Sequence, residues 1–227
     1  MNWSVIADNF PFLMEGLWVT LQITALAVFI GLAIAIPFAL MRNSKNQFMS
    51  WFASLFILFF RGTPLLVQLF LIYYGSGQFR AELEFVGLWV YFRETFFCAV
   101  LALALNTGAY SAEIFSGAIR SVDKNQIEAG RAYGMSGFTL YRRIILPQAL
   151  RIAWNSYANE IIFIMQATSL VSIITLLDLT GAAGRVISKT FAVYEVYIFI
   201  ALMYLAITYC LVFIFSRIEI KLRQHQL

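Results

Sequence analysis

Long apolar runs alternate with short polar segments along this chain of 227 residues. A helix needs about 20 mostly apolar residues to cross a bilayer, and five runs are long enough. We therefore predict an all-α membrane protein with five transmembrane helices, over residues 16–41, 48–74, 96–119, 152–177 and 195–215. Because we find neither a tandem repeat nor a linker, we expect residues 1–227 to form a single domain.

The composition supports a membrane protein. Hydrophobic residues make up 61% of the chain and charged residues only 12%, which leaves too little polar surface to coat a soluble domain of this size. The net charge of +4 matters less than its distribution, and we expect no nucleic-acid partner. Cys98 and Cys210 both lie in apolar runs, so we assign neither a disulfide nor a metal site.

The basic residues are unevenly distributed between the two sides of the predicted membrane. With the N-terminus outside, only four of the 16 basic residues would face outward and one, Arg61, would lie within a span. The four are Arg80, Arg93, Arg185 and Lys189. Since the excess of basic residues marks the cytoplasmic side, we predict an outside N-terminus and a cytoplasmic C-terminus.

The longest inner segment, about residues 120–151, is polar and contains several glycines. Small and apolar residues recur at helical spacing after Asp123, which predicts a short amphipathic helix: Ile127, Ala129, Ala132 and Tyr133. Gly134 can end this helix, and we expect the chain to turn at Pro147 into the fourth span. The pattern alone fits a docking surface for a partner and a helix lying on the inner leaflet equally well.

This segment resembles the signature loop of permease subunits of ATP-binding-cassette (ABC) importers. That pattern has Glu-Ala-Ala, three residues, Gly, nine residues, and then Ile-x-Leu-Pro. The matching residues are Glu128, Ala129, Gly134, Ile144, Leu146 and Pro147, with Gly130 in place of the second alanine. Residues 61–65 (RGTPL) and 156–160 (SYANE) are similar to the subfamily that takes up polar amino acids, near the histidine and arginine permeases.

The resemblance implies a type I ABC importer permease fold, in which the short inner helix is a cytoplasmic coupling helix. Glu128 would pair with a basic residue of a separate ATPase subunit, which binds ATP and Mg²⁺. This chain would then bind no cofactor and would not be an enzyme. Its implied partners are an ATPase dimer, a second identical or paralogous permease, an extracytoplasmic solute-binding protein and membrane lipid.

The same resemblance implies a location in the bacterial cytoplasmic (inner) membrane. The solute would be a small polar amino acid of the basic class, such as arginine, histidine or lysine.

Polar side chains at membrane depth are costly and usually functional. Glu160 and Asn106 each lie about ten residues from a span end, which corresponds to about 15 Å and places both near the bilayer midplane. The Glu160 carboxylate is a candidate partner for a cationic solute, with Asn106 and Asn159 as hydrogen-bond partners. The alternative is that Glu160 only packs within the protein.

Other candidates for the solute pathway lie nearer the span ends. Glu113 follows Asn106 by two helical turns and either lines the exit path or pairs with Arg120. Arg61 precedes Pro64, which predicts a broken helix that faces the pathway or a second permease. Thr168, Ser169 and Asp178 lie toward the outer end, as candidates for an external gate.

Two other classes of protein are rival hypotheses. An ion-coupled carrier or channel would use Glu113 and Glu160 as ion sites. An intramembrane protease would use the Gly-x-Ser-Gly at residues 134–137, but its base is missing from the spans because the only histidine is His225. Residues 184–190 end in Lys-Thr but lack the glycine that a phosphate-binding loop requires, so we expect nucleotide to bind another chain.

Overall fold

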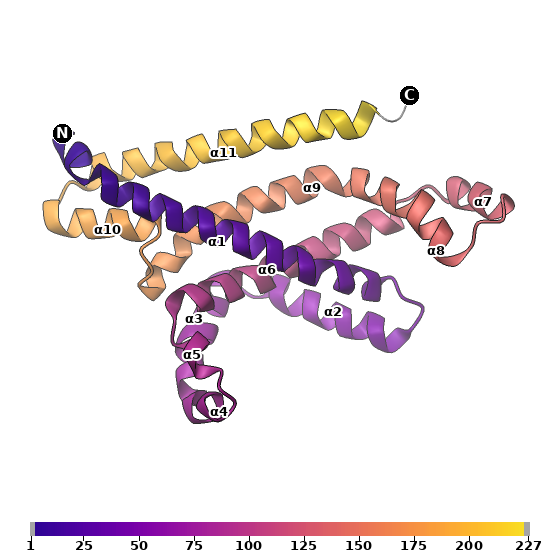
Figure 1. The fold of residues 1–227 in the computed structure, drawn as a ribbon, viewed down its shortest axis with the longest axis horizontal. Coiled ribbons are helices and arrows are strands. Elements are labelled where there is room, and N and C mark those ends of the chain that lie inside the picture. The colour runs from indigo at the N-terminus through magenta and orange to yellow at the C-terminus, as the bar shows by residue number, and fades with distance from the viewer. Residues whose placement is uncertain (1–2, 225–227) are drawn as a thin grey trace.

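The structure is a computed structural model that describes residues 3–224, with side chains as far as Lys221, so that His225 lies outside the described residues. Within this range the chain is helical and contains no strand (Figure 1). The elements are α1 (Ser4–Arg42), α2 (Gln47–Gly62), α3 (Leu65–Ser76), η1 (Gly77–Phe79), α4 (Arg80–Phe85), α5 (Trp89–Phe92), α6 (Thr95–Arg120), α7 (Lys124–Ala132), α8 (Gly137–Leu140), η2 (Tyr141–Ile145), α9 (Leu146–Ala167), η3 (Thr168–Ile174), α10 (Leu179–Thr190) and α11 (Val193–Gln224).

Each predicted apolar run is found in a helix or a helix pair. Four helical units are long and apolar enough to span a membrane, and the bent pair α2–α3 makes a fifth. The first helix begins at Ser4 rather than at residue 16. Its extra turns are ordered by packing, because Ile6 and Leu13 are buried in a cluster with side chains of α10 and α11.

The predicted break at Pro64 is confirmed. α2 ends at Gly62, Thr63 and Pro64 are extended, and the two helices meet at 99°. Proline lacks an N–H and keeps the residue before it out of the helical conformation. The carbonyls freed at the end of α2 gain a new donor, since the Gln68 amide lies 2.8 Å from the Phe60 oxygen and 3.0 Å from the Thr63 oxygen.

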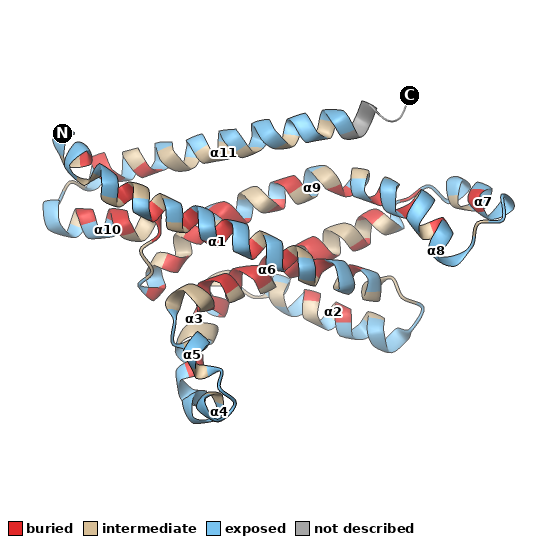
Figure 2. Cartoon of the chain, in the orientation of Figure 1, coloured by how far each residue is buried: buried red, intermediate tan, exposed pale blue. Residues whose placement is uncertain are grey.

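Helix α6 lies at the centre of the molecule, and α1 is the helix that packs most extensively against it. Figure 2 shows buried residues concentrated along α6. The contact includes several small residues, among them Gly31 and Ala35 on α1 and Gly108 and Ala112 on α6. Small residues let membrane helices approach closely enough for their backbones to pack.

Replacing Gly31 by alanine is expected to lower the stability of the α1–α6 pair. The added Cβ would lie 3.2 Å from the Ala104 carbonyl oxygen and 3.3 Å from the Gly108 nitrogen, so the backbones must separate. Overpacking of this kind costs about 1–3 kcal/mol. Gly117→Ala is the matched control, because no atom outside the neighbouring backbone of its own helix lies within 4 Å of its Cβ position. Thermal unfolding in detergent should rank G31A below G117A, and the reverse order would contradict this account.

The expectation that the chain turns at Pro147 is wrong. A single helical unit runs from Gly137 to Ile174, and Pro147 lies inside it. A proline leaves the carbonyl four residues before it without its helical partner, and the π segment Tyr141–Ile145 directly before α9 absorbs this mismatch. The fourth span is therefore continuous with the polar segment that precedes it.

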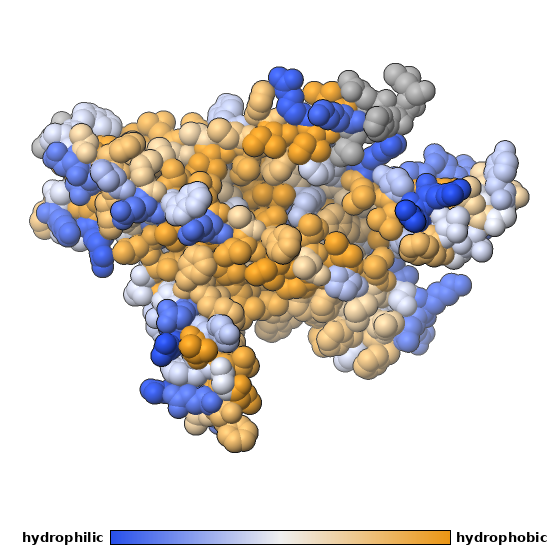
Figure 3. All heavy atoms as spheres, viewed as in Figure 1, coloured by the Kyte–Doolittle hydropathy of each residue, from blue (hydrophilic) through white to orange (hydrophobic). Residues whose placement is uncertain are grey.

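The polar segments gather at the ends of the molecule. The α1–α2 turn and the α7–α8 hairpin lie at one end, and the N-terminus and α10 lie at the other (Figure 1). Figure 3 shows a broad hydrophobic band between these hydrophilic ends, and an arm formed by α4 and α5 on which hydrophilic and hydrophobic residues are mixed. This arrangement fits a membrane around the band.

Candidate functional site

The first candidate site is the α7–α8 hairpin. Asp123 caps α7 as predicted, with its carboxylate accepting a hydrogen bond from the Asn125 N–H at 3.0 Å. Gly134 ends the helix with φ +78. The amide of Gly134 donates to the Arg131 carbonyl at 2.9 Å, and that of Met135 donates to the Gly130 carbonyl at 3.0 Å, which is the Schellman arrangement that favours glycine.

At Gly130, α7 packs closely against α8 and the π segment that follow it in the chain. Gly130 is buried, and a Cβ there would contact Ile144 Cδ1 and would lie 2.8 Å from Leu140 Cδ1. The returning helix therefore packs directly on the backbone of α7. Both contacts are flexible side-chain ends, so the alanine of the family pattern would need only a small shift at this position.

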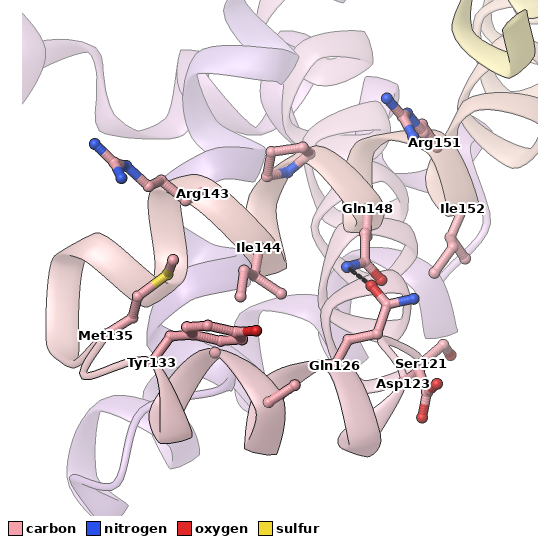
Figure 4. Close-up of a pocket in the computed structure, with 13 residues that line it drawn as sticks. Ser121, Asp123, Gln126, Tyr133, Met135, Arg143, Ile144, Gln148, Arg151 and Ile152 are labelled. Carbon is pink, nitrogen blue, oxygen red and sulfur yellow. Dashed lines mark hydrogen bonds between the residues drawn. The ribbon is translucent and has the colours of Figure 1, made fainter. Parts of the chain in front are cut away.

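A groove of about 950 Å³ lies between the two arms of the hairpin (Figure 4). In this view Ile144 points toward the Tyr133 ring, the Gln126 and Gln148 side chains are hydrogen-bonded, and Arg143 and Arg151 extend away at the rim. The residues of the pattern that line it are Ala129, Gly130, Ile144 and Pro147.

The remaining residues of the pattern lie around this groove. Glu128 is exposed on α7, and Gly134 is exposed at the turn. Leu146 lines a separate apolar cavity of about 300 Å³ beside α1 and α6. Tyr133 and Phe138 are 86% and 77% exposed, so the hairpin offers aromatic surface in addition to the exposed Glu128 charge. This combination suits a protein partner.

The second candidate site is a pair of cavities between α6 and α9, each of about 370 Å³. Asn106 and Glu160 line one of them, and Arg61 and Glu113 line the other. Tyr110 lines both. Asn106, Tyr110 and Glu113 lie on one face of α6. We call these three residues, with the two cavities that they line, the polar strip.

Glu160 is 8% exposed. Its side chain lines the cavity together with Asn106 and Tyr110. None of the ion pairs within 4.0 Å among the described residues involves Glu160. The structure brings Glu160 and Asn106 together as expected, whereas Asn159 is exposed and is not among the residues that line this cavity.

Asn106 has a role that the sequence did not reveal. Its amide donates to the Phe60 carbonyl at 3.2 Å and to Gln68 Oε1 at 3.1 Å. It therefore holds the broken ends of α2 and α3 beside Glu160. Gln68, which is 2% exposed, was not predicted, although a lone amide four residues after Pro64 in an apolar run was an available signal.

Glu113 lies among three arginines. Its carboxylate is 3.2 Å from Arg120, 3.6 Å from Arg42 and 4.0 Å from Arg61. The predicted pairing with Arg120 is present, and Glu113 also lines the second cavity. Tyr110 was not predicted, and its ring lies 5.2 Å from the Arg61 guanidinium carbon, in cation–π geometry.

Thr168, Ser169 and Asp178 do not line the polar strip. The Thr168 hydroxyl donates to the Met165 carbonyl at 2.7 Å, and the Ser169 carbonyl accepts from Ser172 at 2.8 Å. Asp178 is fully buried and caps α10 by accepting from the Gly181 N–H at 2.9 Å and the Thr180 N–H at 3.2 Å. Tyr204 donates to the same carboxylate at 3.4 Å.

Asp178→Asn is expected to change how stability depends on pH. Burial raises the pKa of the Asp178 carboxyl from 3.8 to about 6, although the hydrogen bonds from Gly181 and Thr180 oppose the rise. Between these values the folded state binds more protons than the unfolded state, so stability falls as pH rises. The loss from pH 5 to 7.5 should be about 1–2 kcal/mol for wild type relative to Asp178→Asn.

Thermal unfolding in detergent at these two pH values tests this expectation. Asparagine keeps a capping oxygen without the buried charge, so D178N should equal or exceed wild type at pH 7.5. Asp123→Asn is the control, because it changes an exposed cap of the same kind. Identical pH slopes for wild type and D178N would contradict the assignment.

No group of three or more potential metal-ligating residues occurs within residues 3–221. The fold and the two sites define the class of protein as a helical membrane transport subunit. It has a polar strip between spanning helices and a polar hairpin at one end.

Comparison with known proteins identifies the family. The nopaline transport system permease protein NocM of Agrobacterium fabrum is 49% identical over 209 residues, which is 92% of this chain and 87% of NocM. The histidine/lysine/arginine/ornithine transport system permease protein HisM of Escherichia coli K12 is 41% identical over 227 residues, covering 98% and 94% of the two chains. A solved structure described as an amino acid ABC transporter with histidines superposes with a TM-score of 0.88 at 36% identity, covering 97% of this chain and 99% of that one.

Residues 18–224 match the family of binding-protein-dependent transport system inner membrane components, and the chain belongs to this family. The predicted resemblance is thereby confirmed. The fold is that of type I ABC importer permeases, and the chain is the membrane transport subunit of an ABC transporter whose ATPase is a separate subunit.

Proposed function

We propose that this chain is the permease subunit of an ATP-driven importer for basic amino acids. The single observation that carries the substrate class is the buried Glu160 carboxylate on the cavity that Asn106 and Tyr110 also line. A buried carboxylate without a close cation favours a cationic ligand. The names of NocM and HisM, which refer to nopaline, histidine, lysine, arginine and ornithine, agree with this class.

The α7–α8 hairpin is the proposed ATPase-coupling element. Glu128, Ala129 and Gly134 are exposed on its first arm, where Gly130 is the buried contact with the second arm, and Ile144, Leu146 and Pro147 lie on the returning helix. That helix continues into the fourth span without a turn. A displacement of the hairpin therefore also moves α9, the helix that carries Glu160. The partner ATPase binds ATP and Mg²⁺.

The proposed assembly contains two permease subunits, two ATPase subunits and an extracytoplasmic solute-binding protein. The second permease is a copy of this chain or a paralogue. Residues 1–227 act as one transmembrane domain in the inner membrane. The N-terminus faces outward and the C-terminus faces the cytoplasm, in agreement with the basic residues near the α1–α2 turn and the hairpin.

Reconstitution in proteoliposomes tests this function. The permease, its partner permease and its ATPase are combined with binding protein loaded from a panel of amino acids, and ATP hydrolysis and uptake are measured. Stimulation by the binding protein loaded with L-arginine, L-histidine or L-lysine is the expected result. Uptake that persists without the ATPase would instead identify an ion-coupled carrier or channel.

A further inference from the structure

The apolar cavity of about 300 Å³ between α1, α6 and α9 is called the lateral cavity here. Its lining is entirely apolar and includes Ile36, Leu40, Phe115, Ile119, Leu146 and Leu150. In Figure 1, α1 and α9 separate toward the end that carries the hairpin, with α6 behind them. Ile36 on α1 and Leu150 on α9 are about half exposed, so the walls of the cavity reach the outer surface of the helices.

The lateral cavity lies on the opposite face of α6 from the polar strip. Successive residues of a helix are about 100° apart, which places Phe115 and Ile119 about opposite to Asn106 and Tyr110. Because the polar strip lines the proposed solute pathway, the lateral cavity faces away from that pathway and toward the surrounding membrane. Its apolar walls suit an acyl chain and not a polar amino acid.

The cavity has about the depth of one leaflet. Its lining residues on α1 run from Leu32 to Leu40, which is about 12 Å of helix, and end two residues before Arg42, the last residue of α1. Ile119 is the next-to-last residue of α6, and Leu146 is the first of α9. One leaflet contributes about 15 Å of hydrocarbon, so an acyl chain that enters from the hairpin end can fill the cavity.

Two cations lie beyond the hairpin end of the cavity. Arg142 precedes Leu146 by about one turn, so it continues the face of the helix that lines the cavity. Lys45 lies in the turn after α1, five residues after Leu40. Both are exposed, and among the described residues neither takes part in an ion pair within 4.0 Å. Basic residues at this position attract the phosphate of an anionic lipid.

We propose that the lateral cavity binds one anionic phospholipid of the leaflet at the hairpin end, which is the cytoplasmic leaflet in the proposed orientation. An acyl chain lies between α1, α6 and α9, and the phosphate lies at Arg142, with Lys45 adding to the positive potential. Because α9 belongs to the same helical unit as the second arm of the hairpin, the lipid joins the coupling element to α1 and α6. The site involves neither Glu160 nor the identity of the solute.

Charge should decide which lipid binds. The surrounding tails are as apolar as the walls of the cavity, so contact with an acyl chain does not distinguish one lipid from another. A basic residue near the membrane surface contributes roughly a fivefold preference for an anionic lipid. Phosphatidylglycerol should therefore bind at least about fivefold more tightly than phosphatidylcholine, and Arg142→Gln should remove about a fivefold factor. Arg142→Lys should keep the preference.

Native mass spectrometry of the delipidated transporter complex, titrated with either lipid at equal chain length, measures these affinities. Arg217→Gln is the matched control for R142Q, because Arg217 is an exposed arginine on α11 at the same end of the molecule.

A second pair of variants tests whether the acyl chain occupies the cavity. Ile36→Trp fills the cavity from the α1 wall and should weaken phosphatidylglycerol binding by about fivefold or more. Ile214→Trp is its control, since Ile214 is also 50% exposed but lies on α11 and does not line the cavity. If I36W fails to assemble, Leu150→Trp narrows the cavity from the α9 wall.

These measurements separate the outcomes. Equal affinity of the wild type for the two lipids would overturn the proposal, as would equal losses in R142Q and R217Q or in I36W and I214W. A complete complex that takes up no lipid at this site would show that a second permease covers the cavity, and would also overturn it. A transporter that carries no basic amino acid would leave the lipid affinities unchanged, so this proposal and the proposed function fail separately.

Discussion

Reversing the charge of Glu128 is expected to abolish transport while leaving the permease folded. Glu128 is exposed on α7, so an arginine there meets no buried neighbour. If Glu128 faces a basic residue of the ATPase, Glu128→Arg places like charges at the interface, which costs several kcal/mol. Uptake and the ATP hydrolysis stimulated by the binding protein should both fall below about 5% of wild type.

Glu82→Arg is the matched control for this reversal. Glu82 is an exposed glutamate on α4, in the arm that lies apart from the α7–α8 hairpin. The control should keep near wild-type hydrolysis and uptake. Copurification of the ATPase subunits with each variant measures the docking directly. Full hydrolysis and uptake in E128R would exclude Glu128 from the coupling surface, and equal losses in E82R would show a general charge effect.

The hydropathy pattern predicted the spans well, because each apolar run has the length that a bilayer requires. Pro64 was correctly predicted to break its helix, whereas Pro147 was not expected to lie inside one. The difference is local. At Pro64 the preceding residue is extended and Gln68 caps the freed carbonyls, whereas at Pro147 the π segment keeps the helix intact.

The polar site was only partly predictable, for a related reason. Spacing along a single helix places Asn106 and Glu113 on one face of α6, and this inference needs no knowledge of the other helices. Contacts between helices depend on how the helices cross, which the spacing does not contain. The sequence therefore did not show that Asn106 holds the α2–α3 break, or that Tyr110 joins the two cavities.

Asn159 was predicted to line the site with Glu160 but does not. It is the direct neighbour of Glu160 in the chain, but adjacent residues on a helix point in different directions. Asn159 is exposed, while Glu160 faces the cavity. Being next to Glu160 in the sequence therefore did not identify a residue that lines the cavity. The four-residue spacing on α6, which links Asn106 to Tyr110, was the better guide.

Replacing Glu160 by glutamine is expected to cause the largest loss of transport for a cationic solute. The change keeps the size of the side chain and its place in the cavity that Asn106 also lines, but removes the carboxylate charge. Loss of one partner of a buried charge pair costs about 2–5 kcal/mol. The KM for L-arginine should therefore rise by about 100-fold with wild-type binding protein.

Coupling to the ATPase should survive this substitution, because Glu160 lies on α9 outside the α7–α8 hairpin, which is unchanged. E160Q should therefore copurify with the ATPase subunits, and the liganded binding protein should still stimulate hydrolysis. Asn159→Gln is the matched control, since it alters the exposed neighbouring position on the same helix. Because the charge is what distinguishes the two amino acids, uptake of L-glutamine through E160Q should fall far less than uptake of L-arginine. Equal losses for both would mean that Glu160 supports the helix packing and not the cation.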